Sequence, residues 1–120
     1  MGLRLSHTTV DALDPYAVAE FWRELLTWDV QEVDNYTPES DECYLVSPHG
    51  YTVLFMRCPD RKSVKNRIHF DLVPDGGSTR DEQVERARSL GASLVDDRRA
   101  DLGWAVMADP EGNEFCILDD

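Results

Sequence analysis

Ser47-Pro48-His49-Gly50 recurs 62 residues later as Asp109-Pro110-Glu111-Gly112, and His7 recurs at the same displacement as His69. A displacement shared by separate segments is stronger evidence of duplication than any single match, because chance similarities would scatter in register. The sequence therefore predicts one domain, residues 1–120, built from two copies of about 1–62 and 63–120.

The first copy has the pattern of a strand, a helix and three further strands. Leu3 to Val10 is strand-like, and Asp14-Pro15 offers an N-cap followed by the proline favoured at the first helical position. The expected helix carries apolar residues at three- and four-residue spacing, which predicts one buried stripe: Val18, Phe21, Trp22, Leu25 and Leu26. The three strands are expected over Trp28 to Val33, Cys43 to Ser47 and Tyr51 to Cys58.

The second copy repeats this order after a strand over Arg67 to Val73. Ser78 or Thr79 can cap its helix, with Asp81 or Glu82 three residues on, and Gly91 suits a left-handed C-terminal cap. The last three strands are expected over Ala92 to Asp96, Leu102 to Ala108 and Asn113 to Leu118. The predicted fold class is α+β, with two tandem β-α-β-β-β modules forming a curved, half-barrel-like mixed sheet and the helices on its outer face.

The composition limits the classes of binding partner and the cellular compartment that we expect. With 24 acidic and 12 basic residues the chain carries a formal charge of −12, which repels phosphate backbones and argues against nucleic acid. Apolar runs are too short for a membrane span, and Met1-Gly2-Leu3-Arg4 lacks the apolar stretch of a signal peptide. Cys43, Cys58 and Cys116 form no CxxC pair, so reduced thiols and a cytoplasmic location are expected.

Strand alternation sorts the side chains into two faces. The face expected to be buried under the helices carries Val53, Phe55, Ile68, Phe70, Leu72, Phe115 and Ile117. The open face mixes polar and apolar side chains, as ligand pockets do, and predicts contacts to a small molecule from His7, Tyr44, Leu54, Arg67, His69, Trp104, Glu114 and Cys116. The alternative is an internal charge network of Arg67, His69 and Asp71 with no ligand.

Several segments together resemble the vicinal oxygen chelate superfamily, which includes glyoxalase I, bleomycin-resistance proteins and extradiol dioxygenases. They are Ser6-His7-Thr8-Thr9-Val10, Asp14-Pro15, Phe21 to Trp28, Asn66 to Leu72, Leu90-Gly91-Ala92 and Asp109 to Phe115. Their order covers nearly the whole chain and is most similar to the glyoxalase-like subgroup. The resemblance implies a concave pocket and, because related folds close their clefts by pairing copies or subunits, a homodimer.

The resemblance also implies a divalent metal held by histidines on the first strand of a copy and glutamates on the last. The histidines correspond to His7 and His69, but the glutamate positions, four residues after Gly50 and Gly112, hold Leu54 and Cys116. Glu114 lies two residues away, about 6.8 Å along a strand, which is too far to substitute. No metal or other cofactor is therefore expected. Zinc bound by both histidines and Cys116 is the metal alternative, and Cys116 as a nucleophile is a further one.

The predicted function is a glyoxalase-like small-molecule-binding or enzyme-like domain with an unknown substrate and unknown catalytic residues. A first alternative is a metal-dependent lyase, isomerase or dioxygenase that uses His7 and His69. A second is a homodimer that sequesters a cationic aromatic antibiotic of the bleomycin-resistance type between carboxylates and the rings of Tyr44 and Trp104, as the −12 charge suggests.

Overall fold

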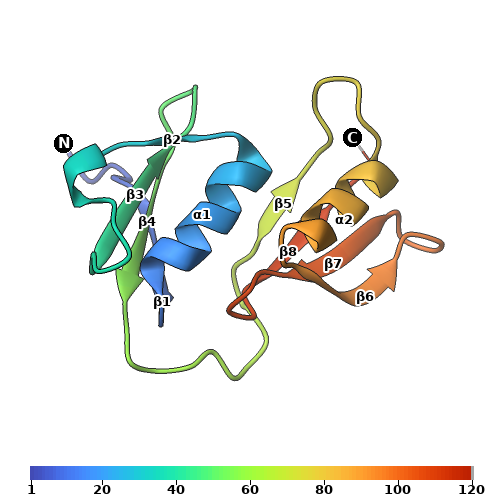
Figure 1. Cartoon of the computed structure of the whole chain (residues 1–120). Helices are drawn as coiled ribbons and strands as arrows, with labels where there is room; N and C mark the ends of the chain where they lie inside the picture. The colour runs from blue at the N-terminus through green and yellow to red at the C-terminus, as the bar shows by residue number, and fades with distance from the viewer. Residues whose placement is uncertain (120) are drawn as a thin grey trace. The chain divides into compact units, whose positions relative to one another are not determined.

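Two four-stranded sheets, each with one helix of its own, make up the computed structural model, which describes residues 1–119 (Figure 1). Contacts group Met1–Arg61 into one unit and the residues from Lys62 into a second. The first unit contains β1 Thr8–Ala12, α1 Pro15–Leu26, β2 Asp29–Val30, a 3-10 turn η1 Val33–Asn35, β3 Glu42–Val46 and β4 Thr52–Arg57. The second contains β5 Phe70–Leu72, α2 Arg80–Ser89, β6 Ser93–Arg98, β7 Trp104–Ala108 and β8 Glu114–Ile117.

The strands are ordered β1-β4-β3-β2 in the first unit and β5-β8-β7-β6 in the second. In each sheet one outer strand is parallel to its neighbour and the other pairs are antiparallel. Both units are therefore β-α-β-β-β modules with mixed sheets, and the predicted α+β fold class is confirmed. Among residues 1–119, no helix has the length and apolar character needed to span a membrane.

The pairing registers repeat at the displacement of 62 read from the sequence. Thr9 pairs with Leu54 across β1 and β4, and Asp71 pairs with Cys116 across β5 and β8. Likewise the β3–β4 pair Tyr44 and Leu54 corresponds to the β7–β8 pair Val106 and Cys116. In these three strands the two copies therefore place corresponding residues at corresponding points of their sheets. The fourth strands depart from this, because Asp29 of β2 and Ser93 of β6 are 64 apart although their partners Val46 and Ala108 are 62 apart.

The repeated turn folds in the same way in both units. Gly50 and Gly112 each have φ +90°, a conformation that favours glycine. Ser47 Oγ accepts hydrogen bonds from the backbone N–H groups of His49 and Tyr51 at 3.2 and 2.9 Å. Asp109 Oδ1 accepts the corresponding pair from residues 111 and 113, both at 2.9 Å. Each side chain is buried, so the turn is held by one polar residue that satisfies two backbone donors.

Helix α1 begins and packs as its sequence predicts. The Asp14 side chain accepts from the backbone N–H of Ala17, and Pro15 takes the first helical position. The apolar stripe is buried against β1, β3 and β4, apart from Leu26, which is half-buried. The helix ends at Thr27 with φ 57°, a left-handed cap that a β-branched residue rarely adopts and that the sequence did not indicate.

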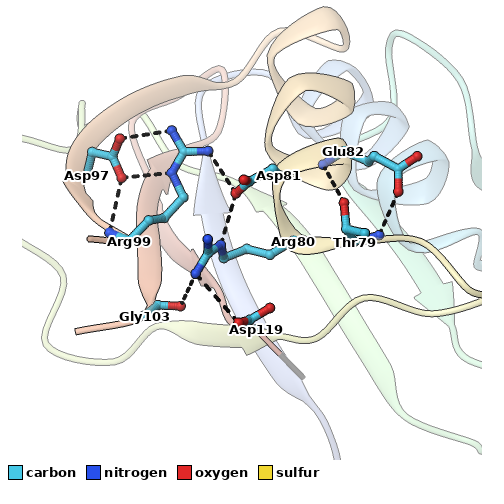
Figure 2. A network of polar contacts seen from close by, with 8 residues as sticks. All are labelled: Thr79, Arg80, Asp81, Glu82, Asp97, Arg99, Gly103 and Asp119. Carbon is cyan, nitrogen blue, oxygen red and sulfur yellow. Dashed lines mark hydrogen bonds and ion pairs between the residues drawn. The ribbon is translucent and has the colours of Figure 1, made fainter. Parts of the chain in front are cut away.

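Helix α2 begins with the predicted capping box of Thr79 and Glu82, and Gly91 follows its end with φ +119°. Figure 2 shows the polar network next to this cap. Arg99 binds Asp97 at 2.8 Å and Asp81 at 3.2 Å, so it joins β6 and its following turn to the first turn of the helix. The network is completed by contacts of Arg80 with Asp81, the Gly103 carbonyl and Asp119.

Three expected strands are much shorter in the structure, among them β5, which forms only over Phe70–Leu72 of the strand expected over Arg67 to Val73. β1 begins at Thr8, five residues after the predicted start, and only Asp29–Val30 of the strand expected over Trp28 to Val33 forms. The chain then turns through η1, where its residues are polar or exposed and offer little apolar surface to a sheet.

The helix-packed face is confirmed for most of its residues but not for Ile68. Val53, Phe55, Phe115 and Ile117 are at most 6% exposed. Phe70 and Leu72 are half-buried because β5 is a three-residue edge strand. The burial expected for Ile68 is wrong, since it is 84% exposed and precedes β5. Its carbonyl accepts from the Asn66 side chain at 3.1 Å, so this segment bonds to itself locally.

Candidate functional site

The open face of the second sheet carries a pocket with a volume of about 650 Å³. Its residues alternate along β8 with Phe115 and Ile117, which are buried on the helix side. Twelve residues line it: Lys65, His69, Asp71, Val95, Asp96, Arg98, Leu102, Trp104, Val106, Glu114, Cys116 and Leu118. Four of the eight residues predicted to contact a ligand are among them, namely His69, Trp104, Glu114 and Cys116.

The strand order divides the pocket chemically. β5 and β8 are neighbours, and they and the segment before β5 contribute most of the polar groups: Lys65, His69, Asp71, Glu114 and Cys116. β7, β6 and the turn between them contribute most of the apolar wall: Val95, Leu102, Trp104 and Val106. Asp96 and Arg98 add charge at the β6 edge. A ligand with one polar end and one apolar or aromatic end matches this arrangement.

His69, Asp71 and Cys116 form a cluster on the polar side. His69 Nδ1 lies 3.1 Å from Asp71 Oδ1, and the Cys116 thiol lies close to the same carboxylate. One possible ligand atom from each residue lies within 4.8 Å of the other two. The cluster follows from the fold, because residues 69 and 71 are two apart near β5 and Cys116 is the register partner of Asp71 on β8.

The Cys116 thiol is poorly suited to act as a nucleophile. It is 7% exposed, and burial raises its pKa, with the negative charge and hydrogen bond of Asp71 acting in the same direction. A reactive cysteine needs its thiolate favoured by a positive environment. The geometry therefore argues against the alternative in which Cys116 attacks a substrate.

Glu114 is engaged by the segment that leads into β5. Its carboxylate accepts from the backbone N–H of Asn66 at 2.8 Å and lies 3.4 and 3.8 Å from the ammonium groups of Lys65 and Lys62. The Asn66 side chain accepts in turn from the Glu114 backbone N–H at 3.2 Å. These contacts, led by the Asn66 hydrogen bond, lower the pKa of Glu114. Glu114 thus fastens residues 62–66 to the rim of the pocket.

The other four predicted site residues lie elsewhere. His7, in the first unit, lines a smaller pocket of about 220 Å³, and its ring centroid is 6.0 Å from that of Tyr44. Leu54 is 2% exposed, so almost none of its surface is open to a ligand. Arg67 is exposed in the segment before β5 and is outside the residues that line the larger pocket.

Eight of the twelve lining residues were not among the predicted site residues, and five of them show why sequence reasoning missed them. It placed Asp71 on the open face without counting it as a site residue, although its spacing of two from His69 was a usable signal. Val95 and Asp96 both reach the pocket because the β6–β7 register shifts between Leu94 and Asp96, and a bulge of this kind defeats simple alternation. Lys65 comes before the strand that was expected to start at Arg67, and Arg98 lies beyond the expected end of its strand at Asp96.

Comparisons with known proteins agree with this architecture. Residues 7–118 match the family model of the glyoxalase-like domain. A hypothetical protein from S. aureus has a TM-score of 0.74 at 14% identity, with 100% of this chain and 96% of that chain covered. Fosfomycin resistance protein FosX from Mesorhizobium loti has a TM-score of 0.71 at 16% identity, with 98% and 92% covered.

A mutant of FosX from Listeria monocytogenes, complexed with Mn(II) and a dihydroxypropylphosphonic acid, has a TM-score of 0.69 at 19% identity, with 98% and 90% covered. At these identities the structural likenesses concern the fold alone. No curated protein matches the sequence.

Proposed function

The chain belongs to the glyoxalase-like domain family of the vicinal oxygen chelate superfamily, and we propose that it binds a small molecule in the pocket of its second unit. The polar end of the ligand lies toward β5 and β8, and its apolar or aromatic end lies over β7 and β6. The division of one pocket of about 650 Å³ into these two halves carries the proposal. Ligand sites of roughly 300–1,000 Å³ typically combine an apolar wall with a few polar groups.

The metal set implied by the family resemblance does not fit these residues. Leu54 is apolar and buried, and Cys116 has a thiol where the second carboxylate would stand. Glu114, the nearest carboxylate by sequence, is bound by Asn66 and two lysines. We therefore assign no reaction that requires two histidines and two carboxylates, and the proposed activity is binding, or catalysis by a different set of groups.

A thermal-shift screen with small oxoacids and their aromatic derivatives tests the proposal, because a compound that binds the folded state raises the melting temperature. Val106→Phe should fill the pocket and weaken any hit by at least about tenfold, or ~1.4 kcal/mol. Val64→Phe is the matched control, since residue 64 is 74% exposed and is outside the residues that line the pocket. Equal weakening by the two variants, or none by Val106→Phe, would contradict the assignment.

Sequestration of a cationic aromatic antibiotic is a second candidate. Trp104 and the carboxylates of Asp71 and Asp96 line the same pocket, a combination that favours an aromatic cation. Calorimetry with bleomycin at low and moderate salt measures such binding. Trp104→Ala should abolish the heat if the pocket is the site, whereas the same loss in Tyr44→Ala alone would place binding in the first unit.

Homodimer formation and a cytoplasmic location are also proposals. Leu3 and Leu5, which are 104% and 82% exposed, are apolar surface that a second copy could cover. Sedimentation over a range of protein concentrations tests the dimer, and a monomer throughout would refute it.

A further inference from the structure

We propose that His69, Asp71 and Cys116 bind a zinc ion on the polar side of the pocket, using ligands from the second unit alone. The proposal rests on the pocket of the proposed function being open to solvent, but it needs no organic ligand. It differs from the set implied by the family resemblance, in which each copy supplies a histidine and a carboxylate.

The positions of two of the three donors, Asp71 and Cys116, are set by apolar packing rather than by the donors themselves. Phe70 pairs with Phe115 and Leu72 pairs with Ile117, and these pairs flank the pair formed by Asp71 and Cys116. Phe115 and Ile117 are at most 2% exposed, so a slip of β5 against β8 would disrupt the core. The sheet therefore holds Asp71 beside Cys116 before any ion binds.

The donor types suit zinc. Thiolate, imidazole and carboxylate are its usual protein ligands, and three of them leave the fourth tetrahedral position open to water or to a ligand in the pocket. The thiol also favours zinc over magnesium or calcium, which prefer oxygen donors. On binding, the metal–sulfur bond replaces the S–H bond, and the proton passes to solvent.

The distances require only small movements. Zinc bonds of about 2.0–2.3 Å place tetrahedral ligand atoms roughly 3.2–3.8 Å apart, and the donor atoms here lie within 4.8 Å of one another. His69 and Asp71 have side chains that are 38% and 51% exposed, so they can rotate toward the buried sulfur. Their mutual hydrogen bond shows that both already point to one place.

Cobalt(II) is the direct probe, because it occupies zinc sites and a thiolate bound to it gives charge-transfer absorption in the near ultraviolet. The full chain without a histidine tag should bind one Co²⁺, show this band, and lose it when Zn²⁺ is added. Cys116→Ser should remove the band. Asp71→Asn, at a side chain that is 51% exposed, should keep the fold and weaken zinc binding at least about tenfold, since even loss of a hydrogen-bond partner of a ligand costs about 10- to 100-fold.

Two matched variants complete the test. Cys58→Ser removes a thiol of the first unit and should leave the band unchanged, and His7→Gln should leave zinc affinity unchanged. Absence of the band, its survival in Cys116→Ser, or loss of zinc binding in His7→Gln would overturn a site made within the second unit. Weakening of a bound oxoacid by Val106→Phe in a chain that binds no zinc would leave the pocket proposal standing and refute the metal alone.

Discussion

The two units share a backbone register across three strands but differ in the chemistry of the open face. A row across three adjacent strands reads Thr9, Leu54 and Tyr44 in the first unit and Asp71, Cys116 and Val106 in the second. The first row ends in a large ring that contacts His7, whereas the second ends in a small side chain beside the larger pocket. The two rows therefore occupy the same positions in their sheets, but they offer different chemical groups to a ligand.

The largest effect should come from the buried face that both units have in common. Phe115→Ala and Phe55→Ala each remove an aromatic side chain that is at most 1% exposed, and each should cost about 3–5 kcal/mol of unfolding free energy. Ile68→Ala should cost less than about 0.5 kcal/mol, because that side chain is 84% exposed. Urea denaturation measures all three, and a comparable loss in Ile68→Ala would contradict the burial described above.

Transplanting the second row into the first unit should create a second metal site. Thr9→Asp with Leu54→Cys places a carboxylate and a thiol at the register positions that Asp71 and Cys116 occupy, beside the existing His7. Loss of the buried leucine should cost roughly 2 kcal/mol, and Co²⁺ stoichiometry should rise from one to two per chain. The control, Thr9→Asn with Leu54→Ser, makes a similar cavity without ligands and should remain at one. A folded transplant that still binds one ion would show that shared register is insufficient.

Variants in the repeated turns should lose less unfolding free energy, and the loss should be larger in the second unit than in the first. Asp109→Ala removes a charged acceptor of two backbone N–H groups and of the Asn113 side chain, and should cost about 1.5–3 kcal/mol. Ser47→Ala removes a neutral acceptor and should cost about 0.5–1.5 kcal/mol. Asp109→Ser, which copies the first unit, should fall between the parent and Asp109→Ala in urea denaturation. Equal losses of unfolding free energy in Asp109→Ala and Ser47→Ala would mean that the charge of Asp109 does not strengthen its hydrogen bonds.

Sequence reasoning succeeded where a local rule decides the structure. The caps of Asp14 and Thr79, the turn glycines and the helix-packed residues of β4 and β8 each depend on a few neighbouring residues, and all were predicted correctly. The alternation was less complete, because Leu54, expected on the open face of β4, is also buried. Ile68 was misplaced because alternation says which face a residue takes but not where a strand begins. Here Asn66 and Glu114 form side-chain-to-backbone hydrogen bonds with each other, just before the point where the strand was expected to start pairing with β8.

The candidate site was predictable only in part, for a physical reason. His69, Trp104, Glu114 and Cys116 were found from strand parity, but the pairing of Asp71 with Cys116 depends on which strands become neighbours. The bulge at Val95 also depends on tertiary pairing, and it shifts Asp96 toward the pocket. Whether the remaining predicted residues contact a ligand stays a prediction.

The smallest expected effect concerns the ion network that only the second unit has. Asp97 and Arg99 lie at the end of β6 and in its following turn, whereas the corresponding strand of the first unit, β2, ends at Val30 and is followed by the 3-10 turn η1. The hydrogen bonds from Arg99 lower the pKa of Asp97 to about 2, against an ordinary value of 3.8. Because the folded-state pKa is depressed, the stabilisation is fully present above the ordinary pKa and is lost as the pH falls from about 4 to about 2.

Asp97→Asn should therefore lower the urea midpoint slightly at pH 7, and the difference from the parent should vanish near pH 2. The effect should be small because Asp97 is on the surface, and salt should reduce it further. Asn35→Asp is the control variant: it adds a carboxylate in η1 of the first unit without adding an arginine, and it should not gain stability between pH 2 and pH 4. A difference between parent and Asp97→Asn that stays constant with pH would show that the asparagine perturbs packing rather than removing an ion pair. A gain in Asn35→Asp would show that an added surface carboxylate stabilises the chain without an arginine partner.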